Sequence, residues 1–214
     1  MLEDLKRAAN GSILETTAGY RTAIGVMGVL LSPVLVTYGL YRQVPIQGSI
    51  SAYYHQTMTR DWFVGTLFVI GTFLFFYKYT PGRTPAKSNI TAVKTGHLDA
   101  WLGKAAGITA VTVALWPTHY PEGTKTFSGY VHYAAAVILF GCLALFPLML
   151  FSNSQTRPRF YKSIGWSMIG VLGIALAWYL FDAKTQPLLA IETALITLFG
   201  WSWFAKGRDQ ATAA

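Results

Sequence analysis

Six apolar runs, each near the length needed to cross a bilayer, constrain this chain more than any other feature. A spanning helix needs about 20 mostly apolar residues. In lipid, the backbone N–H and C=O groups must form hydrogen bonds within each segment, as they do in an α-helix. The sequence therefore predicts an all-α bundle of six transmembrane helices. We expect the spans at Thr22–Tyr41, Asp61–Tyr79, Leu98–Trp116, Gly129–Phe151, Ile164–Phe181 and Pro187–Lys206.

The lysines and arginines predict the orientation of this bundle. Twelve of them lie on the side that carries both termini, against four on the other, so both termini are expected in the cytoplasm. The twelve are Lys6, Arg7, Arg21, Lys78, Arg83, Lys87, Lys94, Arg157, Arg159, Lys162, Lys206 and Arg208, and the four are Arg42, Arg60, Lys125 and Lys184.

Composition places the chain in a membrane and argues against nucleic acid as a partner. Charged residues make up 12% of the 214 residues, about half their share in a soluble domain. The basic residues fall between apolar runs instead of forming one amphipathic cluster. We expect integration in a membrane, with the bacterial inner (plasma) membrane as its location, and membrane lipids as partners.

The loops are too short for a second domain. Residues 1–20 are expected to form a cytoplasmic segment, for which an interfacial helix and a frayed terminus remain alternatives. Residues 21–207 would form the six-helix membrane domain, and residues 208–214 a cytoplasmic tail.

One polar stretch stands between the first two runs. Residues 49–65 read SISAYYHQTMTRDWFVG, and we expect residues 49–61 to fold back against the bundle, with Ile50, Tyr53, Tyr54 and Met58 as its apolar surface. Ser51 and His55 are spaced i, i+4, a spacing that would pair them on a helix and that is common by chance.

Ionisable residues from several runs are predicted to meet in one pocket on the same side as this stretch. Glu192 is the strongest candidate, because an acidic residue within a spanning helix costs about 2.5–3.5 kcal/mol and usually faces a polar interior. His55, Asp61 and His132 would lie at similar depth. Each residue also has a structural alternative. Glu192 would lie at headgroup level and His55 would be solvated. Asp61 would cap its helix and pair with Arg60, and His132 would only form a hydrogen bond at the interface.

The stretch SISAYYH…RDWFVGTLFVIGTFLFFYKY resembles a group of uncharacterised bacterial multi-spanning membrane proteins, in which an S-x-Y-Y-H…R-D segment precedes an apolar helix. The likeness extends from Thr22 to Gly207. A more distant resemblance is to the CREST superfamily of alkaline ceramidases, adiponectin-receptor-like proteins and Per1-type proteins. Its members carry an S-x-x-x-H element, an aspartate and a late H-x-x-x-H pair around zinc. Ser51, His55 and Asp61 match the first two, whereas H-x-x-x-H is absent from the sequence and six spans are predicted in place of seven.

Three functions are compatible with these observations. The first is a metal-dependent lipid or amide hydrolase, as the CREST resemblance implies. Zinc would be held by His55, His132 and Asp61, with Ser51, Asp61 and Glu192 as catalytic residues and Tyr53, Tyr54 and Arg60 as substrate-binding residues.

The second function is a non-catalytic membrane protein that binds a lipid, a small molecule, a second copy or another subunit of a membrane complex. The third is a small proton-linked transporter that uses Glu192 and His132 as titrating groups. The sequence does not identify the ligand or substrate.

Overall fold

Six long helices make up nearly all of the structure, which is a computed structural model. It describes residues 17–77, 89–120, 124–153, 156–181 and 187–212, without the side chains of residues 89–97 and 179. The helices are α2 (Thr17–Tyr41), α3 (Thr57–Phe75), α4 (Asn89–Leu115), α5 (Phe127–Leu145), α6 (Pro158–Phe181) and α7 (Leu188–Ala211). Three short helical turns are η1 (Ser51–His55), η2 (Phe146–Leu150) and η3 (Phe151–Asn153). The described residues contain no strand.

All six predicted spans are present as helices long and apolar enough to cross a membrane. Their bounds differ from the predicted ones in two places that matter. Helix α3 begins at Thr57, before Asp61, so Asp61 lies inside the helix and does not precede it. Helix α7 continues past Lys206 to Ala211, so Lys206 and Asp209 belong to the helix. Of the predicted N-terminal segment, residues 1–16 lie outside the described residues.

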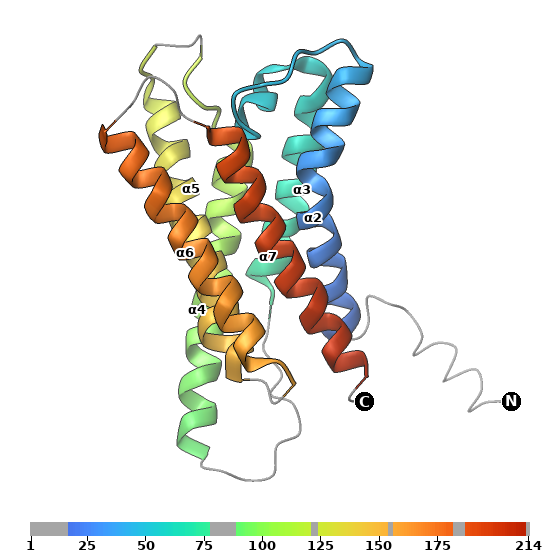
Figure 1. Ribbon diagram of the computed structural model, residues 1–214, viewed down its shortest axis with the longest axis vertical. Helices are drawn as coiled ribbons and strands as arrows, with labels where there is room; N and C mark the ends of the chain where they lie inside the picture. Colours follow the sequence, from blue (N-terminus) through green and yellow to red (C-terminus); the bar gives the residue numbers. More distant parts are fainter. Residues whose placement is uncertain (1–16, 78–88, 121–123, 154–155, 182–186, 213–214) are drawn as a thin grey trace, which may run out of the picture.

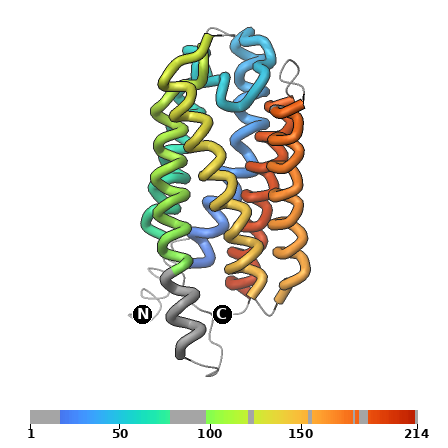
Figure 2. The backbone as a smooth tube through the Cα atoms, turned by 90° about the vertical axis from the view of Figure 1, so that its left-hand side faces the viewer, coloured from blue at the N-terminus to red at the C-terminus, as the bar shows by residue number. Residues whose placement is uncertain are grey.

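The helices form a ring in chain order, which α7 closes by packing along α2 (Figures 1 and 2). Helix α2 begins and α7 ends at the same end of the bundle, which we call the basal end and which lies at the bottom of Figure 1. The opposite end, with residues 42–56 and 116–120, is called the mouth. The assignment of the basal end to the cytoplasm stays a prediction.

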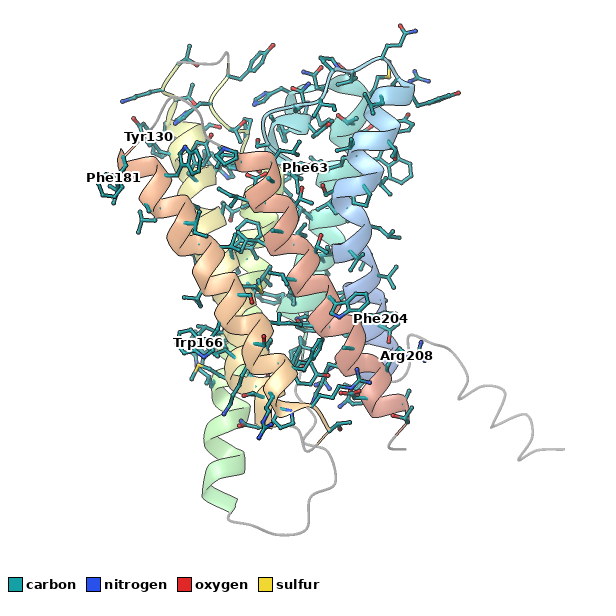
Figure 3. All side chains as sticks on the ribbon, viewed as in Figure 1. Phe63, Tyr130, Trp166, Phe181, Phe204 and Arg208 are labelled. Carbon is teal, nitrogen blue, oxygen red and sulfur yellow. The ribbon has the colours of Figure 1, made fainter. Side chains whose placement is uncertain are left out.

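Glycines allow the closest helix contacts in this ring. A Cβ atom on Gly200 of α7 would lie 2.6 Å from the carbonyl oxygen of Gly25 of α2, and one on Gly107 of α4 would lie 2.6 Å from the backbone nitrogen of Phe75. Small residues let helices approach where lipid supplies no hydrophobic drive for association. Large apolar side chains cover the outside instead, Trp166 and Phe181 of α6 among them (Figure 3).

The basal end of the fourth span departs from regular helix at Pro147. Helix α5 ends at Leu145 and continues as a single π turn, η2, followed by the tight turn η3. Proline has no backbone N–H and disturbs the helical hydrogen-bond ladder, which suits it to such a transition. This change of pitch places Phe151 inside the bundle, where it is fully buried.

Candidate functional site

The polar stretch between α2 and α3 folds into the mouth of the bundle. Tyr53 is only 1% exposed, and Ile50 is also buried. The segment is tied to α7 by a hydrogen bond from Leu189 N to Gly48 O of 2.8 Å. It is tied to α3 by one from Thr59 Oγ1 to Tyr53 O of 3.0 Å. The predicted folding back of residues 49–61 is therefore confirmed, except that Met58 is exposed.

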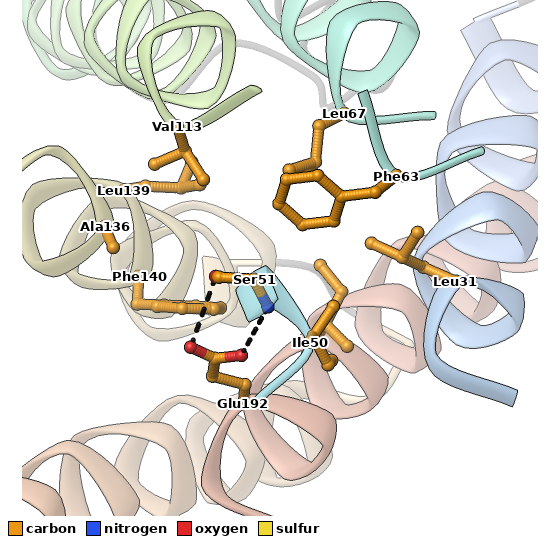
Figure 4. Close-up of a pocket in the computed structure, with 11 residues that line it drawn as sticks. Leu31, Ile50, Ser51, Phe63, Leu67, Val113, Ala136, Leu139, Phe140 and Glu192 are labelled. Atoms are coloured by element: carbon orange, nitrogen blue, oxygen red, sulfur yellow. Dashed lines mark hydrogen bonds between the residues drawn. The ribbon is translucent and has the colours of Figure 1, made fainter. Parts of the chain in front are cut away.

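Ser51 and Glu192 meet where this segment crosses α7 (Figure 4). The backbone N–H of Ser51 donates to Glu192 Oε2 at 3.2 Å, and its hydroxyl donates to Oε1 at 3.3 Å. Glu192 lies one turn into α7, where a carboxylate without partners would be costly. Both carboxylate oxygens are thus satisfied by one residue of the re-entering segment.

This pair forms part of the wall of a small cavity in the mouth. Its volume is about 30 Å³, which gives room for one or two water molecules. Ser51 and Glu192 are its polar residues. The other lining residues are apolar and come from α2, the re-entering segment, α3, α4, α5 and α7: Leu31, Ile50, Phe63, Leu67, Val113, Ala136, Leu139, Phe140 and Ile196.

His55 joins the re-entering segment to the loop after α4. Its Nε2 lies 2.9 Å from Thr118 Oγ1, and its ring stacks on Tyr120 with 4.4 Å between ring centres. Burial lowers the pKa of His55 below its usual value, and the positive charge of Arg60 acts in the same direction, against the raising effect of the hydrogen bond with Thr118. The neutral imidazole is therefore the favoured form in this contact.

The other two histidines at this end make structural hydrogen bonds. His132 is buried in α5, and its Nδ1 donates to Trp116 O at 2.7 Å, because a carbonyl can only accept. His119 Nδ1 accepts from Thr126 N at 3.0 Å at the start of the same helix. Both contacts hold the loop after α4 against α5.

The structure thus brings together only some of the predicted site residues. Ser51 contacts Glu192, whereas the i+4 residue His55 contacts Thr118. Asp61 is exposed on α3. No group of three or more His, Cys, Asp or Glu side chains in the described parts of the chain could hold a metal ion.

Of the predicted substrate-binding residues, one is buried and two lie at the surface. Tyr53, which belongs to the re-entering segment, is buried and packs beside Gly39 of α2. Arg60 and Tyr54 form a pair at the surface of the mouth, with Arg60 Nη2 donating to the Tyr54 hydroxyl at 2.9 Å. None of these three residues lines the cavity.

A second group of polar residues, which the sequence pattern did not single out, lies at the basal end. Arg21 is fully buried and its Nε donates to the Tyr77 hydroxyl at 3.0 Å. Lys206 and Asp209 of α7 are buried as well. Arg21 and Lys206 lie at the ends of the predicted spans, where a basic residue indicates orientation and gives no sign of burial. The i, i+3 spacing of Lys206 and Asp209 is the signal that could have placed them on one helical face.

A comparison with models of protein families finds a match over most of the chain. A family model described as "protein of unknown function (DUF998)" matches residues 19–205, which cover most of the described bundle. No curated protein and no solved structure matches. The resemblance to an uncharacterised family is consistent with this match, whereas the CREST resemblance and the S-x-Y-Y-H…R-D motif receive no support from it.

Proposed function

We propose that this chain, which belongs to the DUF998 family of proteins of unknown function, is a membrane protein that binds a small organic cation in its mouth without transforming it. The observation that carries the proposal is the Glu192 carboxylate, which Ser51 holds at the edge of a cavity with otherwise apolar walls. The chemical class proposed for the ligand is a small protonated amine.

The charge of the cavity favours a cation. Glu192 is its one ionisable lining residue, and no lysine, arginine or histidine lines it. A carboxylate has about four acceptor positions, of which Ser51 uses two, so an ammonium group can still be accommodated. In a site screened from water, this attraction is stronger than at a surface.

The apolar walls favour an amine that carries carbon. The rings of Phe63 and Phe140 line the cavity and could face the cation, an arrangement that stabilises ammonium groups by about 0.5–2 kcal/mol. The volume of about 30 Å³ limits the ligand to a few heavy atoms unless the segment with Ser51 moves. Methylamine is therefore the first probe.

A binding function fits the contacts of Ser51 better than the hydrolase does. A serine nucleophile needs a base that removes its proton, and here the Ser51 hydroxyl contacts Glu192 while His55 contacts Thr118. Hydrolase activity and a zinc ion stay predictions that follow from the distant resemblance. Metal analysis of the purified protein tests the zinc prediction.

Thermal unfolding of the purified protein with added amines tests the binding proposal. Methylamine and trimethylamine, both protonated at neutral pH, should raise the unfolding temperature, whereas methanol and tert-butanol at equal concentration should not. Glu192→Gln should lose this response, because the amide carries no negative charge. Asp61→Asn, which removes an exposed acid from α3, serves as the control and should respond like wild type.

Two results would contradict the proposal. One is an unchanged unfolding temperature of the wild-type protein with every cation in the series. The other is a response of Glu192→Gln equal to that of wild type, which would place the binding elsewhere on the protein.

A further inference from the structure

We infer that the ligand of the mouth cavity is an amphipathic amine with a single alkyl chain, and that it enters from the bilayer through a side opening between α5 and α7. Its ammonium group binds Glu192, and its chain lies along α6 outside the cavity. This inference rests on the cation binding proposed for Glu192, to which it adds the class of amine and the route of entry.

The walls of the cavity are buried on every side but one. Eight of the eleven lining residues are buried, Ile50 and Ser51 of the re-entering segment among them. The three that are partly exposed are Ala136 and Phe140 of α5 and Glu192 of α7. Figure 4 shows Phe140 beside the Glu192 carboxylate. The cavity is therefore accessible from the side, between α5 and α7.

Tyr133 continues this edge of α5 toward the mouth. Tyr133, Ala136 and Phe140 are spaced i, i+3 and i+7, which places them on one face of the helix. Tyr133 is 39% exposed, and its phenol lies close enough to the Glu192 carboxylate to interact with its charge. A partly exposed face of α5 thus leads directly to the carboxylate.

Helix α6 lies between α5 and α7 in the ring, and its packing loosens toward the mouth. In its basal half, Ile164 and Met168 of the inward face are buried. Further along the same face, Leu172 and Ala175 are only partly buried. Trp178, almost one turn beyond Ala175, is 40% exposed. The inward face of α6 therefore has room for an apolar chain in its mouth half.

The loosely packed part of α6 lies at the depth of the carboxylate. Glu192 is four residues from the mouth end of α7, and Ala175 is six residues from the mouth end of α6. Both helices are long and apolar enough to span a membrane, so the side opening faces the hydrocarbon of the bilayer. Figure 3 shows exposed Phe181 at this end of α6.

An amine with an alkyl chain matches both parts of this path. The cavity of about 30 Å³ holds an ammonium group with one or two carbons, so the other carbons of a longer amine must lie outside it. There they would contact Leu172 and Ala175 on one side and lipid on the other. A charged end at Glu192 and an apolar end between the helices satisfy the chemistry of each region.

A series of amines of increasing chain length tests this inference. The protein in phosphatidylcholine nanodiscs is titrated with methylamine, butylamine and hexylamine, and the unfolding temperature is measured. The concentration that gives half of the maximal rise should fall about fourfold for each added methylene, because the chain leaves water. Butan-1-ol and hexan-1-ol, which lack the charge, should give no rise, and Glu192→Gln should remove the response to every amine.

Variants of α6 locate the chain. Ala175→Leu fills the inward face outside the cavity, so it should raise the half-maximal concentration of hexylamine at least tenfold and leave that of methylamine unchanged. Ala177→Leu, at an exposed position of the same helix, is the matched control and should respond like wild type to both amines. Leu172→Phe, on the inward face, replaces Ala175→Leu if the latter does not fold.

The outcomes separate this inference from the function on which it rests. A response to methylamine without a stronger response to hexylamine overturns the inference and leaves cation binding in place. An equal rise with hexan-1-ol, or an equal effect of Ala175→Leu and Ala177→Leu on hexylamine, also overturns it. If no amine raises the unfolding temperature of the wild-type protein, both proposals fail.

Discussion

The backbone N–H and the hydroxyl of Ser51 both donate to the carboxylate of Glu192, which lies 141 residues further along the chain. This contact fastens the re-entering segment to α7 and closes the edge of the mouth cavity. It therefore serves both the packing of the segment and the binding chemistry proposed for Glu192.

Ser51→Ala should lower the free energy of unfolding by about 1.5–3 kcal/mol, the range for a hydrogen bond to a charged group. Chemical unfolding in detergent measures the change. Thr37→Ala is the control, because Thr37 is exposed and bonds only within its own helix, to Pro33 O at 2.6 Å. Combining Ser51→Ala with Glu192→Gln should cost less than the two single changes together; simple additivity would mean that the two side chains are not coupled.

Gly200→Ala should destabilise the bundle by about 1–3 kcal/mol, because the added methyl would overpack a full interface. The new carbon would lie 2.5 Å from Val29 N and 2.6 Å from Gly25 O, and neither backbone atom can move away alone. Gly170→Ala in α6 is the matched control, since its added methyl meets nothing within 4 Å. Equal unfolding temperatures for both variants would contradict the close packing of α2 on α7.

Acidification should weaken the contact of His55 with the loop after α4. The folded protein has a lowered pKa at this histidine, so below the usual value of about 6.5 the unfolded chain takes up the proton more readily. The stability contributed by neutral His55 is thus complete above that pH and is lost as the pH falls through the lowered folded pKa. His55→Gln should reduce this loss in unfolding curves measured across that range. If variant and wild type follow the same pH profile, His55 is not the group responsible.

Labelling with a membrane-impermeant maleimide tests the predicted orientation. In a Cys142→Ala background, Lys125→Cys at the mouth should react from outside intact cells. Lys162→Cys near the basal end should react only after the membrane is opened. The reverse pattern would place the basal end outside the cell and the mouth on the cytoplasmic side.

The spans themselves were predictable because a spanning helix is a local property. Each needs only enough consecutive apolar residues, so the six helices could be located without knowledge of their neighbours. Their ends depend on tertiary contacts, because a charged side chain lies within the last turns when it is buried against another helix. Lys206 was placed at a helix end for this reason, and five further residues of α7 follow it.

The partners of the polar residues could not be predicted in the same way. The i, i+4 spacing favoured a contact between Ser51 and His55, but η1 is a tight turn that directs Ser51 to α7 and His55 to Thr118. The depth of Glu192 was predictable from its distance to the start of the span. Which side chain would meet it depended on how the segment before α3 enters the mouth.

By itself, the sequence determined that the chain is an all-α membrane bundle with six spans and that a carboxylate lies near one end of it. Hydropathy acts on each segment separately, so these conclusions need no contact information. Only the tertiary structure decided that Glu192 meets Ser51 and that Arg21 and Lys206 share the ring of Phe151. Those contacts depend on the order and rotation of the helices, which the close approach of Gly25 to Gly200 and the change of pitch at Pro147 establish between distant parts of the chain.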